Sequence, residues 1–331
     1  MADHAVLIGV QPNPTGFSLL NGPGNDALRF GDWLMAADGG GVPAANVHVA
    51  NVPSPPHKPA TVEGVREAFR PMVQLAAQSG LQEDRLFIFA SGHGLGDLSN
   101  SWDTGLITSD ADATYRLHVA VNRYADFMFR SQRFKQIIFL TDCCRDVDPQ
   151  WPIIPPQLPI MLNPPTGSAP RRFFGAAANW GVQAKESQFD GVWHGYFTKA
   201  LLEALDHMPG DHRGRLKGAD VATYVHARIA NWQERAALLP IPEFAYDVVR
   251  DVDFGKARSL PFPMKLEVGP NATGRKARLL FDGQGHPVDE VVLASGAMSW
   301  GMRPGLYILE VEDTQIRIPL SVPADTTIHV P

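Results

Sequence analysis

The chain has 331 residues, 44% of them hydrophobic and 19% charged, a composition that is typical of folded globular proteins and excludes disordered and fibrous classes. Its net charge of −6 and its scattered basic residues argue against nucleic acid or an anionic membrane as a partner. No apolar run approaches the roughly 18 residues of a membrane span, no basic signal-peptide region precedes the first apolar run, and the two cysteines are adjacent, so we expect a cytoplasmic protein.

The first two thirds of the sequence alternates short apolar runs with helical patterns. Strands are predicted at 4–10, 46–52, 85–91, 135–141 and 171–178. Helices are predicted at 25–37, 61–80, 117–131, 196–208 and 218–237, the first with Asn25 as its cap and the second running from a Thr61 cap to Gly80. Several strands are apolar on consecutive residues, as in strands that are covered on both faces. The alternation therefore predicts an α/β fold with a mainly parallel central sheet flanked by helices.

Two later segments differ in character from this region. Residues 149–170 are dense in proline, which excludes a helix or a central strand there. Beyond residue 258, short strands alternate with Gly, Pro and Asn turns, at 264–268, 276–282, 290–295, 305–313, 315–322 and 327–330. We therefore expect an α/β domain at 1–258, with a loop at about 149–172, and a small all-β sandwich domain at 259–331.

A histidine and a cysteine each follow a predicted buried strand. His93 lies between two glycines in "FIFASGHG", and Cys144 ends the run "IIFLTDCC". The carboxyl ends of parallel strands share one edge of a sheet, so the two side chains can meet without being close in sequence. A cysteine nucleophile needs a nearby base and backbone N–H groups for the developing oxyanion. Taken singly, the histidine also fits a turn and the cysteine also fits core packing.

Five segments together resemble the caspase-like cysteine peptidases, and more closely their prokaryotic-type metacaspase and paracaspase branch. His93 lies 51 residues before Cys144, near the separation of about 50 in caspases. The similar segments are "HAVLIGV" with "LLNGPGNDALRFGDWL", "FIFASGHG", "GLITSDAD", "IIFLTDCCRD" and "AKESQFDGVWHGYFTKALLEAL". They span about residues 4–250 in the family's order. The resemblance implies a caspase-like fold and a thiol protease of peptidase family C14.

Carried over to this chain, the resemblance makes His93 the general base and acid and Cys144 the nucleophile. The residues themselves suggest the backbone N–H groups of Gly94 and Cys144 as an oxyanion hole, because Gly94 leaves its N–H unobstructed beside His93. Cys143 takes the family's small-residue position, where a packed side chain is expected. The match departs after the cysteine, because metacaspases usually continue His-Ser-Gly, whereas Arg145 and Asp146 follow here. Neither residue has an assigned role at this level.

Two aspartates predict the bond that is cut. The basic-specific branch of the family uses an Asp in the Asn-Asp-Ala segment and the Asp two residues before the cysteine, which are Asp26 and Asp142 here. No Lys or Arg occurs from residue 1 to 28, where caspases supply an arginine for acidic substrates. Alternatively, Asp26 is a first-turn helix residue and Asp142 a turn former. The pattern favours cleavage of protein substrates after Arg or Lys.

Arg171 and Arg172 end the proline-rich loop and would suit self-processing or cleavage by an activating protease. Capping of the next strand explains them equally well. We expect no cofactor and no metal: several metacaspases need calcium, but the spacing of Asp103, Asp110 and Asp112 does not fit an EF-hand loop.

Trp180 and Trp193 flank the Ala-x-Glu segment and suit either a substrate subsite or core packing. A different class of function is also open. The α/β part would then be a catalytically silent scaffold, and the β domain would bind a regulatory protein partner.

Overall fold

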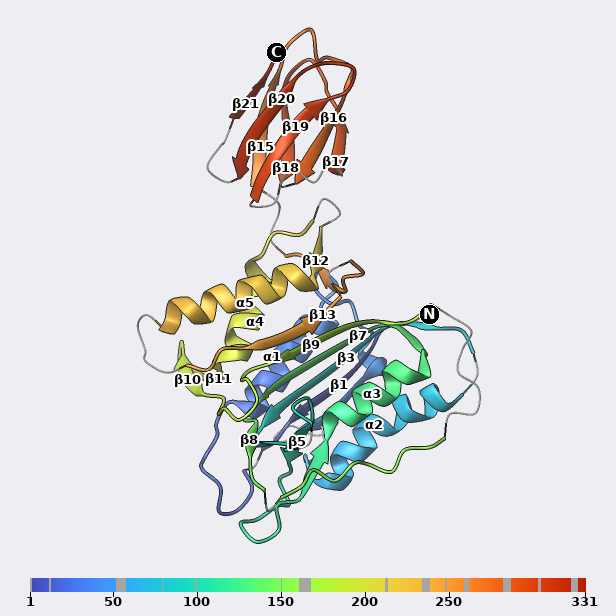
Figure 1. Cartoon of the computed structure of the whole chain (residues 1–331), viewed down its shortest axis with the longest axis vertical. Helices are drawn as coiled ribbons and strands as arrows, with labels where there is room; N and C mark the ends of the chain where they lie inside the picture. Colours follow the sequence, from blue (N-terminus) through green and yellow to red (C-terminus); the bar gives the residue numbers. More distant parts are fainter. Residues whose placement is uncertain are drawn as a thin grey trace. The chain divides into compact units, whose positions relative to one another are not determined.

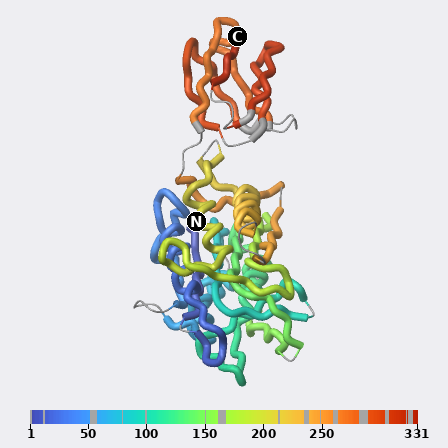
Figure 2. The backbone as a smooth tube through the Cα atoms, turned by 90° about the vertical axis from the view of Figure 1, so that its left-hand side faces the viewer, coloured from blue at the N-terminus to red at the C-terminus, as the bar shows by residue number. Residues whose placement is uncertain are grey.

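The computed structural model describes residues 2–11, 13–51, 58–78, 80–98, 100–149, 151–160, 168–211, 214–233, 239–247, 249–258, 262–281, 287–302, 305–322 and 327–331. It divides into two compact units, one of Met1–Leu205 with Lys217–Gly255 and the other of Asp206–Leu216 with Lys256–Pro331. The sequence analysis placed the boundary at 258 and did not anticipate the segment 206–216 in the second unit. Figure 2 shows the N-terminus in the first unit and the C-terminus in the second.

A six-stranded sheet forms the centre of the first unit (Figure 1). Its strand order is β13 (Glu243–Tyr246), β9 (Arg171–Ala176), β7 (Phe134–Cys143), β3 (Glu83–Gly92), β1 (His4–Gly9) and β2 (Val47–Asn51). All neighbours pair in parallel except β13, which runs antiparallel to β9. The prediction of a mainly parallel α/β sheet is therefore confirmed. Strand β13 was not predicted.

Helices cover both faces of this sheet. They are α1 (Pro23–Met35), α2 (Val62–Ala77), α3 (Val121–Ser131), α4 (Tyr196–His207) and α5 (Gly218–Gln233). Helices α2 and α3 lie on one face (Figure 1), and the rings of α1 and α4 pack on the other, where Phe30 contacts Phe87 and Phe89 and Phe197 contacts Phe244. Alternate strand residues therefore point to different helices, as the period of two in a strand requires.

All five predicted helices exist, but their ends differ from the prediction. Thr61 caps α2 as predicted and accepts a hydrogen bond from the Gly64 backbone N–H at 3.0 Å, although the helix ends at Ala77, before Gly80. The Asn25 cap is wrong, because Pro23 starts α1 and its fixed backbone angle suits the first helical turn. Residues His118–Ala120 form a strand rather than the start of α3.

Several short strands surround the end of the central sheet. One small sheet has the order β6 (His118–Ala120), β5 (Thr104–Ile107), β4 (Gly94–Gly96) and β8 (Asp146–Val147). A hairpin joins β10 (Glu186–Phe189) to β11 (Val192–Gly195), directly before α4. Strands β12 (Arg215–Lys217) and β14 (Asp253–Lys256) lie where the chain passes between the two units. Among the described helices, none is long and apolar enough to cross a membrane.

The second unit is built from two antiparallel-rich sheets. One contains β18 (Gly296–Met302), β15 (Phe262–Val268) and β21 (Thr327–Val330). The other contains β17 (Pro287–Val292), β16 (Lys276–Phe281), β19 (Gly305–Val311) and β20 (Arg317–Val322). Side chains from both sheets, such as Leu266 and Leu309, share a separate buried core. The sequence analysis missed β18, whose Gly, Ala and Ser residues give a weak strand pattern.

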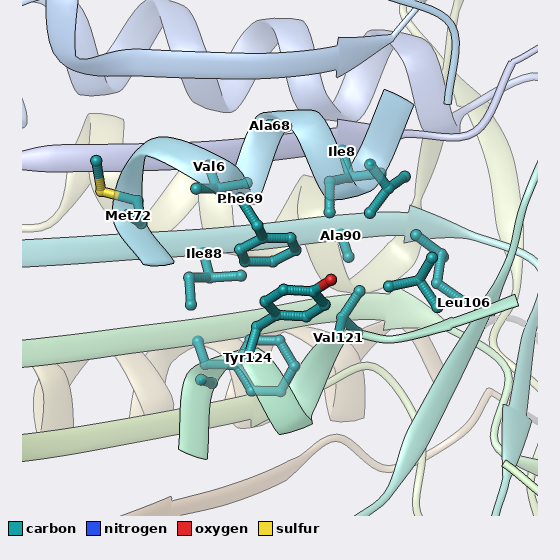
Figure 3. Packing of buried hydrophobic residues seen from close by; sticks show 14 of the residues in the cluster. Val6, Ile8, Ala68, Phe69, Met72, Ile88, Ala90, Leu106, Val121 and Tyr124 are labelled. Atoms are coloured by element: carbon teal, nitrogen blue, oxygen red, sulfur yellow. The ribbon is translucent and has the colours of Figure 1, made fainter. Parts of the chain in front are cut away.

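The core beneath α2 and α3 holds a pair of stacked aromatic rings. Phe69 of α2 and Tyr124 of α3 have ring centroids 4.1 Å apart, and Figure 3 shows them facing each other beside Ile88 and Ala90 of β3. Both side chains are buried, Phe69 completely. The pair therefore joins both helices to the sheet that carries the candidate site.

We predict that Phe69→Ala lowers the free energy of unfolding by about 3–5 kcal/mol, because it removes a buried ring and leaves a cavity. Urea unfolding followed by circular dichroism measures the change. Tyr124→Phe is the matched control and should cost less than about 1 kcal/mol, since the stacked ring remains. A loss below about 1 kcal/mol for Phe69→Ala would contradict the packing described here.

Candidate active site

His93 and Cys144 lie level with each other at the ends of two paired strands. Gly92 of β3 is opposite Cys143 of β7, and beyond the two residues Leu95 of β4 is opposite Asp146 of β8. The residues of each of these two pairs are 51 positions apart in the sequence, as are His93 and Cys144. His93 is therefore in register with Cys144. Neighbouring strands lie about 4.8 Å apart, so the backbones at these two positions are neighbours.

Gly94 is required by the close approach of the backbone that carries Cys144. A methyl group at Gly94 would overlap the carbonyl oxygen of Cys144 and touch the side chain of Cys143. Only glycine fits at such a crossing without moving the backbone. The glycine noted in the sequence beside His93 therefore allows the segments that carry His93 and Cys144 to approach each other closely. The role of the Gly94 and Cys144 N–H groups in an oxyanion hole stays a prediction.

One hydrogen bond sets the tautomer of His93. Its Nε2 lies 2.8 Å from the carbonyl oxygen of Ser18, and its ring packs against Phe17 with centroids 5.4 Å apart. Because a carbonyl only accepts, Nε2 carries the proton, which leaves the lone pair on Nδ1. Burial lowers the pKa of His93 below its usual value. The imidazole is therefore neutral at neutral pH and can act as a base.

Cys144 is a protonated thiol at rest. Burial raises its pKa to about 11, and its Sγ lies 3.8 Å from the carbonyl oxygen of Ala184. Such a thiol needs a base before it can attack a substrate. Cys143 is 1% exposed within the core, where burial also raises its pKa, as the packing interpretation expected.

A narrow pocket beside Cys144 is lined by three acidic side chains. Besides Cys144 and the carboxylates of Asp26, Asp142 and Glu186, it is bordered by Leu20, Pro23, Ser91, Gly92, Ala184, Lys185 and Gly195. The structure thus brings the two predicted substrate-binding aspartates together next to the sulfur. Glu186 had no role in the sequence analysis, although its Ala-x-Glu segment was noticed there.

Asp142 is held by the first turn of α4. Its Oδ2 accepts hydrogen bonds from the Thr198 backbone N–H at 2.9 Å and from the Thr198 hydroxyl at 2.6 Å. Burial, followed by the neighbouring charge of Asp26, raises the pKa of Asp142 to about 7. A methyl group at Gly195 would overlap this carboxylate, so a glycine is required there. Thr198 and Gly195 are further site residues that sequence reasoning missed.

Asp26 and Glu186 are held from other elements. Asp26 accepts hydrogen bonds from the Ser91 hydroxyl at 3.0 Å and from the Gly195 backbone N–H at 3.3 Å, and its burial raises its pKa well above the usual value. Glu186 accepts hydrogen bonds from the backbone N–H groups of Asn21 and Gly22, the latter at 2.8 Å, at the start of α1. Anions are favoured at a helix N-terminus, which offsets part of the cost of their burial.

Arg145, unexplained in the sequence analysis, anchors the turn that follows Cys144. Its side chain is fully buried and pairs with Glu243 of β13, with the carbonyl oxygen of Ser101 and with that of Ala178. Its guanidinium therefore ties three separate segments to the residue next to Cys144. Asp146, also unexplained, accepts a hydrogen bond from the Gln183 side chain at 2.7 Å.

The two candidate processing residues lie at the start of a central strand. Arg171 and Arg172 begin β9, opposite Gln136 and Ile137 of β7, and Arg171 donates to the carbonyl oxygen of Asp251 at 2.8 Å. This placement favours the strand-capping alternative, and processing stays a prediction. Of the proline-rich loop, residues 150 and 161–167 lie outside the described part of the chain, and residues 151–160 form neither helix nor strand.

Asp103, Asp110 and Asp112, which the sequence analysis considered for calcium, each have different partners. Asp103 pairs with Arg123, Asp110 accepts from the Val62 backbone N–H, and Asp112 closes its own turn. Within the described ranges, no group of three or more His, Cys, Asp and Glu side chains is arranged to hold a metal ion. The expectation that no cofactor is needed stays a prediction.

The two tryptophans beside the Ala-x-Glu segment are partly exposed. Trp180 donates its ring N–H to the carbonyl oxygen of Asp97 at 2.9 Å, and the carbonyl oxygen of Trp193 accepts from the Asn25 side chain at 3.1 Å. Both rings stay candidates for a substrate subsite.

Comparison with known proteins gives one curated relative and a set of structural neighbours. The chain is 31% identical over 216 residues to a probable protease from a Desulfuromonadales bacterium. The match covers 62% of this chain and 26% of the relative, so the chain spans about a quarter of that protein's length. A crystal structure of caspase-1 from Spodoptera frugiperda aligns with a TM-score of 0.48 and 14% identity, covering 78% of this chain and 91% of that one. No family model matches the sequence.

The raised pKa of Cys144 gives a testable pH dependence. Because only the thiolate reacts, alkylation by iodoacetamide should be slow at pH 7 and rise about tenfold per pH unit towards pH 10. Mass spectrometry of the alkylated peptide measures the rate at each cysteine. Cys143→Ala should leave the profile unchanged, and Cys144→Ala should abolish labelling. A rate that is already maximal near pH 7 would instead indicate a resting thiolate paired with protonated His93.

Proposed function

We propose that the chain is a caspase-like cysteine endopeptidase that cleaves proteins after Arg or Lys. The observation that carries the proposal is the register of His93 with Cys144 beside a pocket lined by Asp26, Asp142 and Glu186. The likeness to a protein named a probable protease agrees with it. A pocket that presents carboxylates next to a nucleophile suits a guanidinium or ammonium side chain.

The reaction follows from the two reactive groups. Nδ1 of His93 takes the proton of Cys144 as the sulfur bonds to the scissile carbonyl carbon, and the carbonyl electron pair moves to oxygen. The N–H groups of Gly94 and Cys144 are the proposed donors to this oxyanion. His93 then gives its proton to the leaving amine as the C–N bond breaks. Water, deprotonated by His93, hydrolyses the thioester and restores the thiol.

The carbonyl oxygen of Ser18 has a defined part in this cycle. When His93 takes up the proton, it becomes an imidazolium whose Nε2–H still donates to Ser18 at 2.8 Å. A hydrogen bond from a charged donor is stronger than one from a neutral donor, so the contact stabilises the intermediate more than the resting state.

We also propose that the proline-rich loop after Cys144, at about 149–172, regulates the peptidase activity. The described segment 151–160 is attached to the peptidase unit, because the Ile153 N–H donates to Asp97 at 3.3 Å and the Ile154 N–H donates to His118 at 3.0 Å. Cleavage or release of this segment by an activating protease or partner would free the surface that it covers.

The specificity is tested with matched peptides that end in Arg, Lys or Asp before a fluorogenic group. We predict hydrolysis after Arg and Lys, and its loss in Cys144→Ala and His93→Ala. Asp26→Asn and Asp142→Asn should each lower kcat/KM about 30-fold or more, since each removes a buried charge that faces the substrate cation. Asp32→Asn is the matched control, because Asp32 lies on the same helix with its side chain 64% exposed.

Two results would contradict the proposal. Preference for Asp over Arg would refute the assignment of the pocket. Failure of an Arg-bearing acyloxymethylketone to label Cys144 in a His93-dependent way would favour a silent scaffold, with the β unit as the binding part.

The pKa of Asp142 predicts how the activity depends on pH. A bound cation favours the ionised carboxylate, so kcat/KM for Arg substrates should fall as the pH drops through about 7, where Asp142 takes up a proton. The decline is measured between pH 8 and 6.5, above the range in which His93 becomes protonated, because burial lowers its pKa. Asp142→Asn should flatten this slope. If the pH dependence of kcat/KM is unchanged in Asp142→Asn, the decline is due to another titrating group.

A further inference from the structure

A second histidine lies behind the pocket and takes no part in the proposed reaction. His194 of β11 is 6% exposed, and its Nδ1 lies 2.8 Å from Oδ1 of Asp26, which is 1% exposed. The next residue, Gly195, lines the pocket beside Cys144, whereas the imidazole is not part of the pocket wall. His194 therefore contacts the candidate substrate-binding carboxylate from the side away from the substrate.

The contacts of Asp26 divide between its two oxygens. Oδ2 accepts from the Ser91 hydroxyl and the Gly195 N–H, and Oδ1 meets the imidazole of His194. An ionised carboxylate is an acceptor only, and each of these three groups can donate. A carboxylate that accepts several hydrogen bonds keeps its charge at a smaller cost when it is buried. The imidazole thus fixes the oxygen that the other two donors leave free.

Five charged side chains lie around His194. They belong to four elements: Asp26 and Arg29 to α1, Asp142 to β7, Glu186 to β10 and Lys199 to α4. Burial, and then Lys199 and Arg29, lower the pKa of His194, while Asp142 raises it. A neutral imidazole with its proton on Nδ1 donates to Asp26 without cancelling the charge that a substrate cation needs.

We propose that His194 is a positioning residue of the specificity pocket, which orients Asp26 towards the basic side chain of the substrate and donates to its ionised form once that side chain is bound. This inference rests on the proposed function, because it concerns how the pocket binds Arg or Lys. Since His194 touches neither the sulfur nor the substrate, its loss should weaken binding of the basic side chain and leave the chemistry of Cys144 intact.

The test compares His194→Leu with His194→Asn on Arg and Lys peptides. The Asn side-chain nitrogen takes the place of Nδ1 and can donate to Asp26, whereas Leu fills the space without a donor. We expect His194→Leu to raise KM about tenfold or more with kcat within about threefold of wild type, because Oδ1 of the buried Asp26 carboxylate loses its donor. His194→Asn should restore KM to within about threefold of wild type, which a role in packing alone would not produce.

Two controls accompany these kinetics. His207→Leu, at an exposed position in the last turn of α4, should leave KM unchanged. Iodoacetamide labelling of Cys144 should proceed at the wild-type rate in both His194 variants.

The outcomes of these experiments distinguish the inference about His194 from the proposed function. A wild-type KM in His194→Leu would overturn the inference and leave the proposed function standing. Equal losses in the Leu and Asn variants, together with lower thermal unfolding midpoints, would assign His194 to folding and also overturn it. Wild-type protein that cleaves neither Arg nor Lys peptides would overturn the proposed function, and this inference with it.

Discussion

The register between β3 and β7 is the constraint on which the candidate site depends. A parallel pair can slip only in whole residues, and a slip of one would turn every side chain to the opposite face. Here the core residues Phe87 and Phe89 pack against Phe30 of α1, so the hydrophobic pattern excludes a slip of one residue. That register puts Gly92 opposite Cys143 and hence His93 level with Cys144. The burial of aromatic rings in mid-sheet thus helps to position His93 and Cys144 at the end of the two strands.

The alternation of side chains along the same two strands separates the residues of the candidate site from those of the core. Residues two apart point to the same face of a strand. Asp142 and Cys144 accordingly both line the pocket, while Cys143 between them belongs to the core under α2 and α3. On β3, Ser91 contacts Asp26 in the same way, two residues before His93. The period of a strand therefore decides which of two adjacent cysteines lines the pocket.

The sequence predicted the central strands because they are long apolar runs, and it singled out His93 and Cys144 because each follows such a run. It did not predict β13, whose four residues include the charged Glu243 and which pairs at the edge of the sheet. A short edge strand carries little hydrophobic signal, and its pairing with β9 depends on contacts far apart in the chain.

The same reason explains the missing site residues. Glu186, His194 and Thr198 act through hydrogen bonds to α1 and β7, more than 50 residues away in sequence, and no local pattern records such a contact. Arg145 was noticed only as a departure from the family, since its partners Glu243, Ser101 and Ala178 come from three distant segments. Helix boundaries failed for a local reason, because Pro23 outweighs Asn25 as the start of α1.

Asp26, Asp142 and Glu186 place three carboxyl groups in one pocket. Burying several carboxylates in one place is unfavourable, because each loses hydration and repels the others. The fold offsets part of this cost with donors from four elements: Thr198 to Asp142, Ser91 and Gly195 to Asp26, and the N-terminus of α1 to Glu186. The remainder appears as the raised pKa values of Asp26 and Asp142. A cation beside these carboxylates would lower both pKa values, because an opposite charge favours the ionised form of a carboxyl group.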